Sequence, residues 1–337
     1  MNTFCLSLDI GYSNLKVVMG TTDLRLTAGA AAGAPRILLS PAGAAPADRM
    51  PERIRGKEEP AVLRVQVGEE AYVACVSLER LQDWNRVLHS DYPGTSSYRA
   101  LFHAALLLSE RDTVEQVVTG LPVSHYQDRK RRQALVDRLE GEHQITPKRK
   151  VRVEKADVIP QPVGGYMDYA SQATDLNLLK GSRLLVVDPG FFSFDWVFIV
   201  NGDLRQSSSG TSQQATSVIL EETDRHLEED YGGRVGRERL EQALRLGLDQ
   251  VMLYGQPVTM APYLDKAAHR IVPVALAAMR EALRNEGDAD IVLLTGGGAG
   301  FFATATRELF PRSQVVMAPE PVYANARGFW FYGSLED

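Results

Sequence analysis

The chain has 337 residues, of which 44% are hydrophobic and 24% are charged, and its formal net charge is −6. This length allows one large domain or two of ordinary size, and the apolar fraction is enough for a hydrophobic core. The acidic balance argues against direct nucleic-acid binding, and two cysteines are too few for a disulfide scaffold. No apolar run reaches the roughly 18 residues of a membrane span and no basic leader precedes the first strand, so we expect a cytoplasmic protein without membrane contact.

The N-terminal segment predicts a β-hairpin. Phe4–Ile10 and Leu15–Gly20 are apolar runs of strand length, and Gly11–Asn14 is the turn between them. From Ala28 to Pro60 the composition shifts to alanine, glycine and proline, which predicts irregular structure. Alternating apolar residues return over Val62–Ala74, which predicts a second hairpin.

The next segment predicts a helix, a strand and a charged helix. Ser97–Ser109 has a strongly apolar helix face, and Val114–Val118 is a buried strand that ends at Thr119–Pro122. A charged helix is expected over Tyr126–Leu139, with the basic run Arg129–Arg132. Such a run is either a solvated helix face or a docking patch for a partner.

A short strand is expected at Val151–Val153, and an extended segment at Asp157–Tyr166, whose prolines stop it before a helix that begins near Gly165. Leu184–Ile199 then predicts two apolar strands joined by a turn. The remaining predicted elements are a polar loop and helix over Gly210–Tyr231, helices over Arg237–Leu246, Tyr263–Arg284, Phe302–Leu309 and Tyr323–Gly333, and strands over Ile291–Leu294 and Val315–Met317.

The turns of the two strand pairs carry residues suited to phosphate and its metal ion. The motifs are Asp9-x-Gly11-x-Ser13-Asn14-x-Lys16 and Asp188-x-Gly190-x-x-Ser193-x-Asp195. Glycine lets backbone amides approach a phosphate without a Cβ in the way, and a lysine adds a point charge. Mg²⁺ keeps most of its waters and needs only a few carboxylate oxygens. Taken alone, Lys16 is better explained as a surface lysine.

Together these motifs resemble the two phosphate-binding hairpins of the actin-like ATPase superfamily. Thr295-Gly296-Gly297-Gly298-Ala299 resembles the adenosine motif of that superfamily. Asn325-Ala326-Arg327-Gly328 resembles the final connecting motif of bacterial plasmid-segregation actins of the ParM/StbA type. The matches occur in the right order from residue 9 to residue 333, so the resemblance covers essentially the whole chain. Within that group, the second hairpin looks most like the actin-like component of PRTRC plasmid systems.

The resemblance implies a site for ATP or ADP with Mg²⁺. Gln161 would orient the attacking water, although a surface loop amide is the alternative; Asp188 would polarise that water or hold the metal ion with Asp9. Phe191-Phe192 stands where relatives have small residues, so these side chains must point away from the phosphates, and slow hydrolysis is expected. The implied nucleotide-binding residues are Gly11, Tyr12, Ser13, Asn14, Lys16, Gly190, Phe191, Ser193, Gly296, Gly297, Gly298 and Ala299.

The implied fold is α/β: a duplicated actin-like (ribonuclease H-like) fold with two domains flanking a nucleotide cleft. Domain I would take residues 1–164 and about 320–337, with a small inserted subdomain at about 30–90. Domain II would take residues 165–319, with a helical subdomain at about 205–270.

The implied function is a filament-forming, Mg²⁺-dependent ATPase in plasmid DNA segregation. The chain would assemble head to tail and contact DNA through an adaptor protein. Two alternatives stay open. A small-molecule kinase of the same superfamily is one, although the length and the missing Cys-rich zinc motif argue against it. A non-polymerising, nucleotide-regulated scaffold is the other, and nothing in the sequence excludes it.

Overall fold

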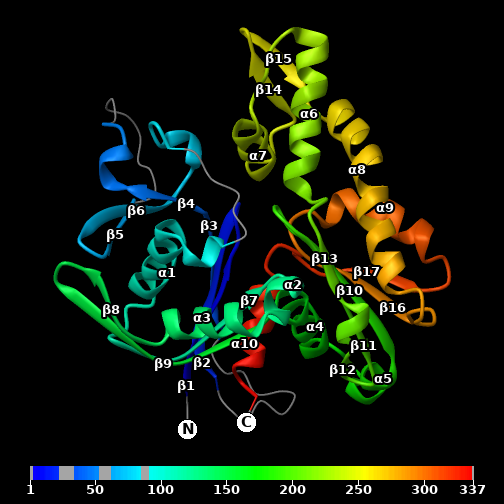
Figure 1. Ribbon diagram of the computed structural model, residues 1–337, viewed down its shortest axis with the longest axis horizontal. Coiled ribbons are helices and arrows are strands. Elements are labelled where there is room, and N and C mark those ends of the chain that lie inside the picture. The colour runs from blue at the N-terminus through cyan, green and yellow to red at the C-terminus, as the bar shows by residue number, and fades with distance from the viewer. Residues whose placement is uncertain (1–2, 23–33, 53–61, 85–90, 336–337) are drawn as a thin grey trace. The chain divides into compact units, whose positions relative to one another are not determined.

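The computed structural model describes residues 3–22, 34–52, 62–84 and 91–335, and the chain divides into two compact units (Figure 1). Unit 1 comprises the residues up to Leu121, His125–Ser171 and the segment from Asn325 onward. Unit 2 comprises Pro122–Ser124 and Gln172–Ala324. Within the described residues, no helix combines the length and the apolarity needed to cross a bilayer.

Unit 1 contains a mixed sheet with the strand order β3-β2-β1-β7-β9-β8 and a smaller antiparallel sheet with the order β4-β6-β5. In the larger sheet, β1 is antiparallel to β2 and parallel to β7, and β7 is parallel to β9. The strands are β1 (Thr3–Ile10), β2 (Asn14–Thr22), β3 (Arg36–Pro41), β4 (Gly43–Pro46), β5 (Leu63–Val67), β6 (Glu70–Val76), β7 (Thr113–Leu121), β8 (Gly141–Thr146) and β9 (Arg149–Pro160). The helices are α1 (Ser96–Leu108), α2 (Val123–Gln127), α3 (Arg129–Leu139), α4 (Gln161–Ser171) and α10 (Ala324–Tyr332), with 3-10 turns at Ala47–Arg49, Leu78–Arg80 and Tyr92–Gly94.

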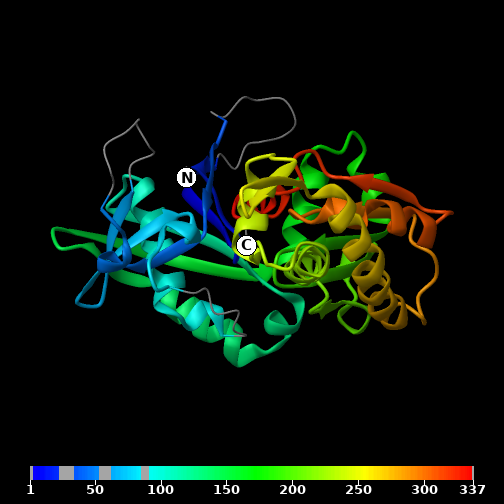
Figure 2. The same ribbon diagram turned by 90° about the horizontal axis from the view of Figure 1, so that it is seen from above.

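Unit 2 contains a sheet with the strand order β12-β11-β10-β16-β17, to which β13 adds beside β11. A separate hairpin, β14–β15, lies with α6 and α7 at the far end of this unit from β12 (Figures 1 and 2). The strands are β10 (Arg183–Pro189), β11 (Phe194–Val200), β12 (Asp203–Leu204), β13 (Gly210–Ser212), β14 (Gln250–Leu253), β15 (Gln256–Thr259), β16 (Ile291–Leu294) and β17 (Gln314–Met317). The helices are α5 (Leu176–Gly181), α6 (Thr216–Tyr231), α7 (Arg237–Arg245), α8 (Ala261–Ala282) and α9 (Ala299–Leu309), with a 3-10 turn at Gln206–Ser208.

The two larger sheets share one topology. In unit 1, β2 pairs antiparallel with β1, and β7 and β9 follow in parallel. In unit 2, β11 pairs antiparallel with β10, and β16 and β17 follow in parallel. The predicted duplicated α/β fold is therefore confirmed. Each copy begins with a hairpin whose turn lies at the end of a central strand.

Helix α10 completes the core of unit 1. Phe329 and Trp330 pack against Cys5 and Val118 of the sheet. α10 also crosses α4 closely, because a Cβ added to Gly328 would lie 1.7 Å from the carbonyl oxygen of Gly164. A polar contact fixes the same crossing. Nε and Nη2 of Arg327 donate to the two oxygens of the buried Asp168 carboxylate, each at 2.9 Å.

Three sequence predictions are wrong in their detail. The alanine- and glycine-rich stretch predicted to be irregular contains β3 and β4 in its described part; Gly43 lets β4 approach β6, since a Cβ there would lie 2.1 Å from the carbonyl oxygen of Val76. The helix predicted over Tyr126–Leu139 is two helices, because Asp128 has extended backbone and its carboxylate accepts the amide of Lys130 at 2.9 Å. α4 begins at Gln161, before the predicted start.

The small sheet of unit 1 is joined to the larger one through two buried histidines. His103 of α1 and His143 of β8 have ring centroids 5.7 Å apart. His103 Nδ1 lies 2.6 Å from the carbonyl oxygen of Gln66 in β5, so this nitrogen carries the proton. Among the described residues, no group pairs with the buried Nε2 of His103. Burial lowers the pKa of His103 to about 4.

Replacing Gly328 by alanine should destabilise the protein, since the new Cβ would overlap the Gly164 carbonyl and force α10 away from α4. We expect a loss of about 2 kcal/mol or more in the free energy of unfolding, measured by chemical denaturation. Gly300→Ala is the matched control in α9, because a Cβ there meets nothing within 4 Å. Equal stability of the two variants would contradict the close crossing.

Stability should fall as the pH drops from about 6.5 toward about 4. The unfolded chain protonates His103 near its ordinary pKa of 6.5, whereas the folded chain does so only near 4. The unfolded state therefore binds more protons in this window, and the slope is at most about 1.4 kcal/mol per pH unit for this group. Denaturation at several pH values should show a shallower loss for His103→Gln and the parental loss for the exposed control His269→Gln. Parallel profiles for all three proteins would refute the assignment.

Candidate functional site

The first hairpin brings three of the predicted site residues together in unit 1. Asp9 and Lys16 are cross-strand partners of β1 and β2, and Lys16 Nζ lies 2.9 Å from Asp9 Oδ2. Gln161 Nε2 donates to Asp9 Oδ1 at 3.4 Å. The lysine is mostly buried, with 13% of its side chain exposed, so it is not an ordinary surface lysine. The carboxylate of Asp9 thus holds a cation and an amide on its two oxygens.

Gln161 reaches Asp9 because of where α4 begins. β9 runs parallel to β7 as far as Pro160, and the chain enters the helix at the next residue. Pro162 is tolerated there because the first turn of a helix has no amide partner to lose. β7 is in turn fixed to β1 by Thr119, whose hydroxyl donates to the carbonyl of Leu8 at 2.7 Å. Gln161 is therefore the first residue of a helix, and the alternative of a surface loop amide does not hold.

The turn of the first hairpin is closed by a hydrogen bond from the Gly11 amide to the Asn14 carbonyl at 3.1 Å. A Cβ at Gly11 would lie 3.3 Å from Lys16 Nζ, so glycine leaves room for the ammonium group above the turn. The Tyr12 ring stacks on Tyr92 at 4.2 Å between centroids, which leaves the backbone of Tyr12 to contact a ligand. Asn14 Nδ2 donates to Ser13 Oγ, and Asn14 Oδ1 is buried with no hydrogen-bond partner among the described residues.

In unit 2, the second hairpin is built around a different buried carboxylate. Asp195 accepts hydrogen bonds from the Ser193 hydroxyl, the Thr211 hydroxyl and the Val123 amide, at 2.5, 2.5 and 2.8 Å. Burial raises the pKa of Asp195, and these three hydrogen bonds oppose that shift. The Ser193 hydroxyl proton is thus committed to Asp195. The Gly190 amide closes the turn onto the Ser193 carbonyl at 2.8 Å.

The glycine run Gly296–Gly298 wraps around the end of β10. A Cβ at Gly296 would lie 2.1 Å from Asp188 Oδ1, and Gly296 has a φ of +74°, so both space and backbone require glycine. A Cβ at Gly298 would lie 2.4 Å from Thr216 Oγ1, and the Gly298 amide donates to the carbonyl of Pro189 at 2.9 Å. At Gly297 a Cβ would meet only Val322 at 3.8 Å, and Ala299 begins α9 fully buried. The turn and the glycine run therefore form one packed group.

Phe191 points into the core of unit 2. Its ring packs against the apolar cluster that α6, α7 and the β14–β15 hairpin form, together with Leu220 and Leu240. Its carbonyl accepts the Ser217 amide at 2.8 Å, and the Gly190 carbonyl accepts the Thr216 amide at 3.2 Å. The bulky residue therefore ties the second turn to the start of α6.

The donor set suits a cation that keeps its waters. Among the described residues, no cluster of three or more histidine, cysteine or acidic side chains could hold a metal ion. Mg²⁺ needs only one or two carboxylates when water and phosphate oxygens supply the rest. Asp188 is buried beside the glycine run, and both oxygens of Asp9 accept hydrogen bonds. These two carboxylates are the predicted ligands.

One polar group of this region escaped the sequence analysis. Thr216 begins α6, and its Oγ1 is buried next to Gly298 with no hydrogen-bond partner within the described part of the chain. A threonine after a polar loop gives no distinctive signal in one sequence. Glu241 and Arg245 are candidates from the sequence by general position only, with solvated helix charges as the alternative; Glu241 of α7 is buried, and Arg245 lies 3.7 Å from it.

Comparisons with known proteins agree with this architecture. Residues 7–164 match the family described as "Actin like proteins N terminal domain". A search of curated proteins gives no match. Solved structures that resemble the chain include a non-polymerisable quadruple mutant of pCBH ParM. Its TM-score is 0.74 at 18% identity, and the match covers 98% of this chain and 99% of that one.

Two further structures resemble the chain over nearly its whole length. Ta0583, an archaeal actin homolog in complex with ADP, has a TM-score of 0.68, 18% identity and coverage of 98% and 99% of the two chains. A ParM from Clostridium botulinum, solved in a 15-stranded filament, has a TM-score of 0.71, 17% identity and coverage of 99% of both chains. The family match covers residues 7–164, and the resemblance to these solved structures over both units shows that the chain has the actin-like fold.

Proposed function

We propose that the chain binds ATP with Mg²⁺, hydrolyses it slowly and forms filaments that act in plasmid DNA segregation. The observation that carries the catalytic part is the contact of Lys16 and Gln161 with the two oxygens of Asp9. The ADP complex of Ta0583 and the ParM filament of Clostridium botulinum support the nucleotide and the filament, respectively. We also propose that the chain is of the ParM/StbA type, similar to the actin-like component of PRTRC plasmid systems.

Phosphate binding is assigned to the two glycine turns and to Lys16. Gly11 and Gly190 place no Cβ in their turns, and the ammonium of Lys16 lies close to Gly11. The buried Asn14 Oδ1 and Thr216 Oγ1 are polar atoms whose burial is costly unless a ligand or water completes them. Gly296 and Gly298 would lie beside the adenosine, and Glu241 is a candidate for contacting its ribose.

Gln161 would orient the water that attacks the γ-phosphate. A carboxylate can only accept hydrogen bonds, so the group that faces Asp9 Oδ1 must be the Gln161 amide NH₂. The carbonyl oxygen of Gln161 is thereby turned toward the opposite side, where it can accept a hydrogen from a water. Phosphoryl transfer depends mostly on such positioning and on charge, because its transition state is loose.

Mg²⁺ fits the donor set of Asp188, and when bound it would neutralise charge on the phosphates. Asp9 would act indirectly, by holding Lys16 and Gln161 in place.

Filament formation would follow the head-to-tail assembly that non-closing contacts allow. DNA would be reached through an adaptor protein, since the chain carries a net charge of −6. The protein would work in the cytoplasm.

Removing the Gln161 side chain should slow hydrolysis and spare binding. We expect Gln161→Ala to lower kcat for ATP by about a hundredfold, since the water loses its orienting acceptor. The Kd of a fluorescent ATP analogue should change little. Gln133→Ala, an exposed glutamine of α3, is the matched control and should keep parental turnover. If Gln161→Ala hydrolyses ATP at the parental rate, the assigned role is wrong.

The metal assignment is tested with Asp188→Ala. This variant should lose Mg²⁺-dependent hydrolysis while its far-UV circular dichroism stays parental. Unchanged turnover in this variant would remove Asp188 from the site.

ATP with Mg²⁺ should produce polymer that sediments above a critical concentration of protein. A non-hydrolysable analogue should give more persistent polymer, because hydrolysis would no longer weaken the contacts between subunits. Pelleting at a series of protein concentrations, with light scattering in parallel, measures both effects. A monomer or a closed dimer under both nucleotides would replace the filament by a nucleotide-regulated scaffold.

A further inference from the structure

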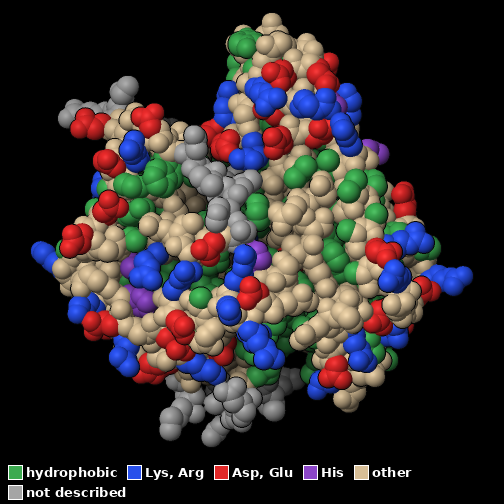
Figure 3. Space-filling model, viewed as in Figure 1, with side chains coloured by type: hydrophobic (Ala, Val, Ile, Leu, Met, Phe, Trp, Pro, Cys, Tyr) green, Lys and Arg blue, Asp and Glu red, His purple; other side chains and the backbone are tan. Residues whose placement is uncertain are grey.

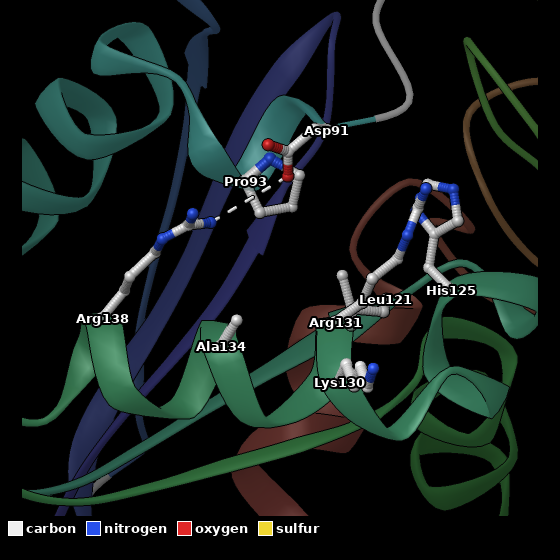
Figure 4. Close-up of a pocket in the computed structure, with 8 residues that line it drawn as sticks. All are labelled: Asp91, Pro93, Leu121, His125, Lys130, Arg131, Ala134 and Arg138. Atoms are coloured by element: carbon white, nitrogen blue, oxygen red, sulfur yellow. Dashed lines mark ion pairs between the residues drawn. The ribbon is translucent and has the colours of Figure 1, made fainter.

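A cavity of about 220 Å³ lies in unit 1 between α3 and the segment before α1 (Figure 4). Its apolar lining consists of Pro93, Leu121 and Ala134. Its polar lining consists of Asp91, His125, Lys130, Arg131 and Arg138. None of its lining residues takes part in the proposed hydrolysis.

The cationic side chains come from one helix face. Arg131, Ala134 and Arg138 are three and four residues apart on α3, so the two guanidinium groups flank a small apolar side chain. Figure 4 shows Arg138 and Arg131 at the two ends of this row, and Figure 3 shows basic side chains gathered over the region of α3. The cluster lies on a protein whose net charge is −6.

The ion pairs of these side chains are exposed to solvent. Asp91 and Arg138 are 4.0 Å apart, and Arg131 and Asp128 are 3.6 Å apart, with about half of each side chain exposed to solvent. Pairs of this kind contribute roughly 0–1 kcal/mol and exchange readily for a better acceptor. Burial lowers the pKa of His125, and Arg131 adds to that shift, so His125 is neutral at neutral pH and can donate or accept a hydrogen bond.

We infer that this cavity is the docking site for an acidic segment of a separate partner protein, which inserts an apolar side chain between two carboxylates. The carboxylates would face Arg131 and Arg138, and the apolar side chain would contact Leu121 and Ala134. Charge complementarity selects such a segment, because paired guanidinium groups bind carboxylates in two-pronged geometry.

The lining favours a segment over a small anion. A free phosphate needs convergent N–H groups, whereas here apolar side chains line the cavity beside the cations, and 45% of Arg131 and 40% of Arg138 are exposed to solvent. A second copy of this chain is also a poor occupant. The acidic run at the end of α6 is already paired within its own unit, Glu228 with Arg234, Glu229 with Arg225 and Asp230 with Tyr263.

The test uses the full chain and a fluorescein-labelled synthetic peptide in which leucine alternates with glutamate and aspartate, read by fluorescence anisotropy. Arg131→Gln/Arg138→Gln should weaken its binding by about tenfold or more. Arg129→Gln/Lys148→Gln removes the same charge from exposed positions outside the cavity and should change the Kd by less than about twofold. Ala134→Phe should also weaken binding, because it fills the cavity and leaves every charge in place.

Any of the following results would overturn the inference. Equal losses in the two double variants would mean unspecific charge attraction. Equal binding of a peptide with serine in place of leucine, or displacement by inorganic phosphate at matched ionic strength, would mean a small-anion site. Absence of binding to the parental protein would remove the site altogether. Circular dichroism confirms that each variant is folded, and hydrolysis is not needed for any readout.

Discussion

The site of unit 1 depends on the two contacts that the carboxylate of Asp9 makes. This carboxylate lies at the end of a central strand, where one oxygen holds Lys16 of the neighbouring strand and the other holds Gln161 of α4. The two strands of the hairpin and the distant start of α4 are thereby set in one geometry. Since a buried carboxylate without partners is strongly unfavourable, the requirement to satisfy Asp9 also orients the lysine and the amide. Asp195 has the same organising role in unit 2, where two hydroxyl groups and an amide converge on it.

Much of the fold could be predicted from the sequence, because apolar periodicity and strand length are local signals. The hairpins β1–β2 and β10–β11 are long apolar runs around glycine turns, and both were predicted. β4 could not be, because alanine and glycine signal a loop in isolation and become a strand only when Val76 lies close by. The start of α4 was also missed, because prolines at its first turn are tolerated only when the preceding strand ends at the right residue.

The site residues likewise divide into those that a local sequence pattern predicts and those that only contacts with distant residues identify. Motif order located the glycine turns, Asp9 and Gln161, yet sequence alone could not tell Lys16 from a surface lysine. Its burial comes from its partner across the hairpin. The sequence predicted that Phe191 points away from the phosphates but did not show what it packs against, since the apolar cluster that receives it is formed by segments about 30 to 70 residues further along. Thr216 carries no local signal at all; only its distance from Gly298 singles it out.

The discontinuity of unit 1 has a consequence for how the protein matures during synthesis. Apart from Pro122–Ser124, unit 2 is one uninterrupted stretch of chain, whereas unit 1 needs α10, which the ribosome makes after unit 2. Until Phe329 and Trp330 emerge, the nascent sheet exposes the apolar surface around Cys5 and Val118. Unit 2 can therefore close its core first, whereas the sheet of unit 1, although synthesised earlier, is completed only when α10 is made. In that interval the unfinished half is the natural client of chaperones, which bind exposed apolar surface.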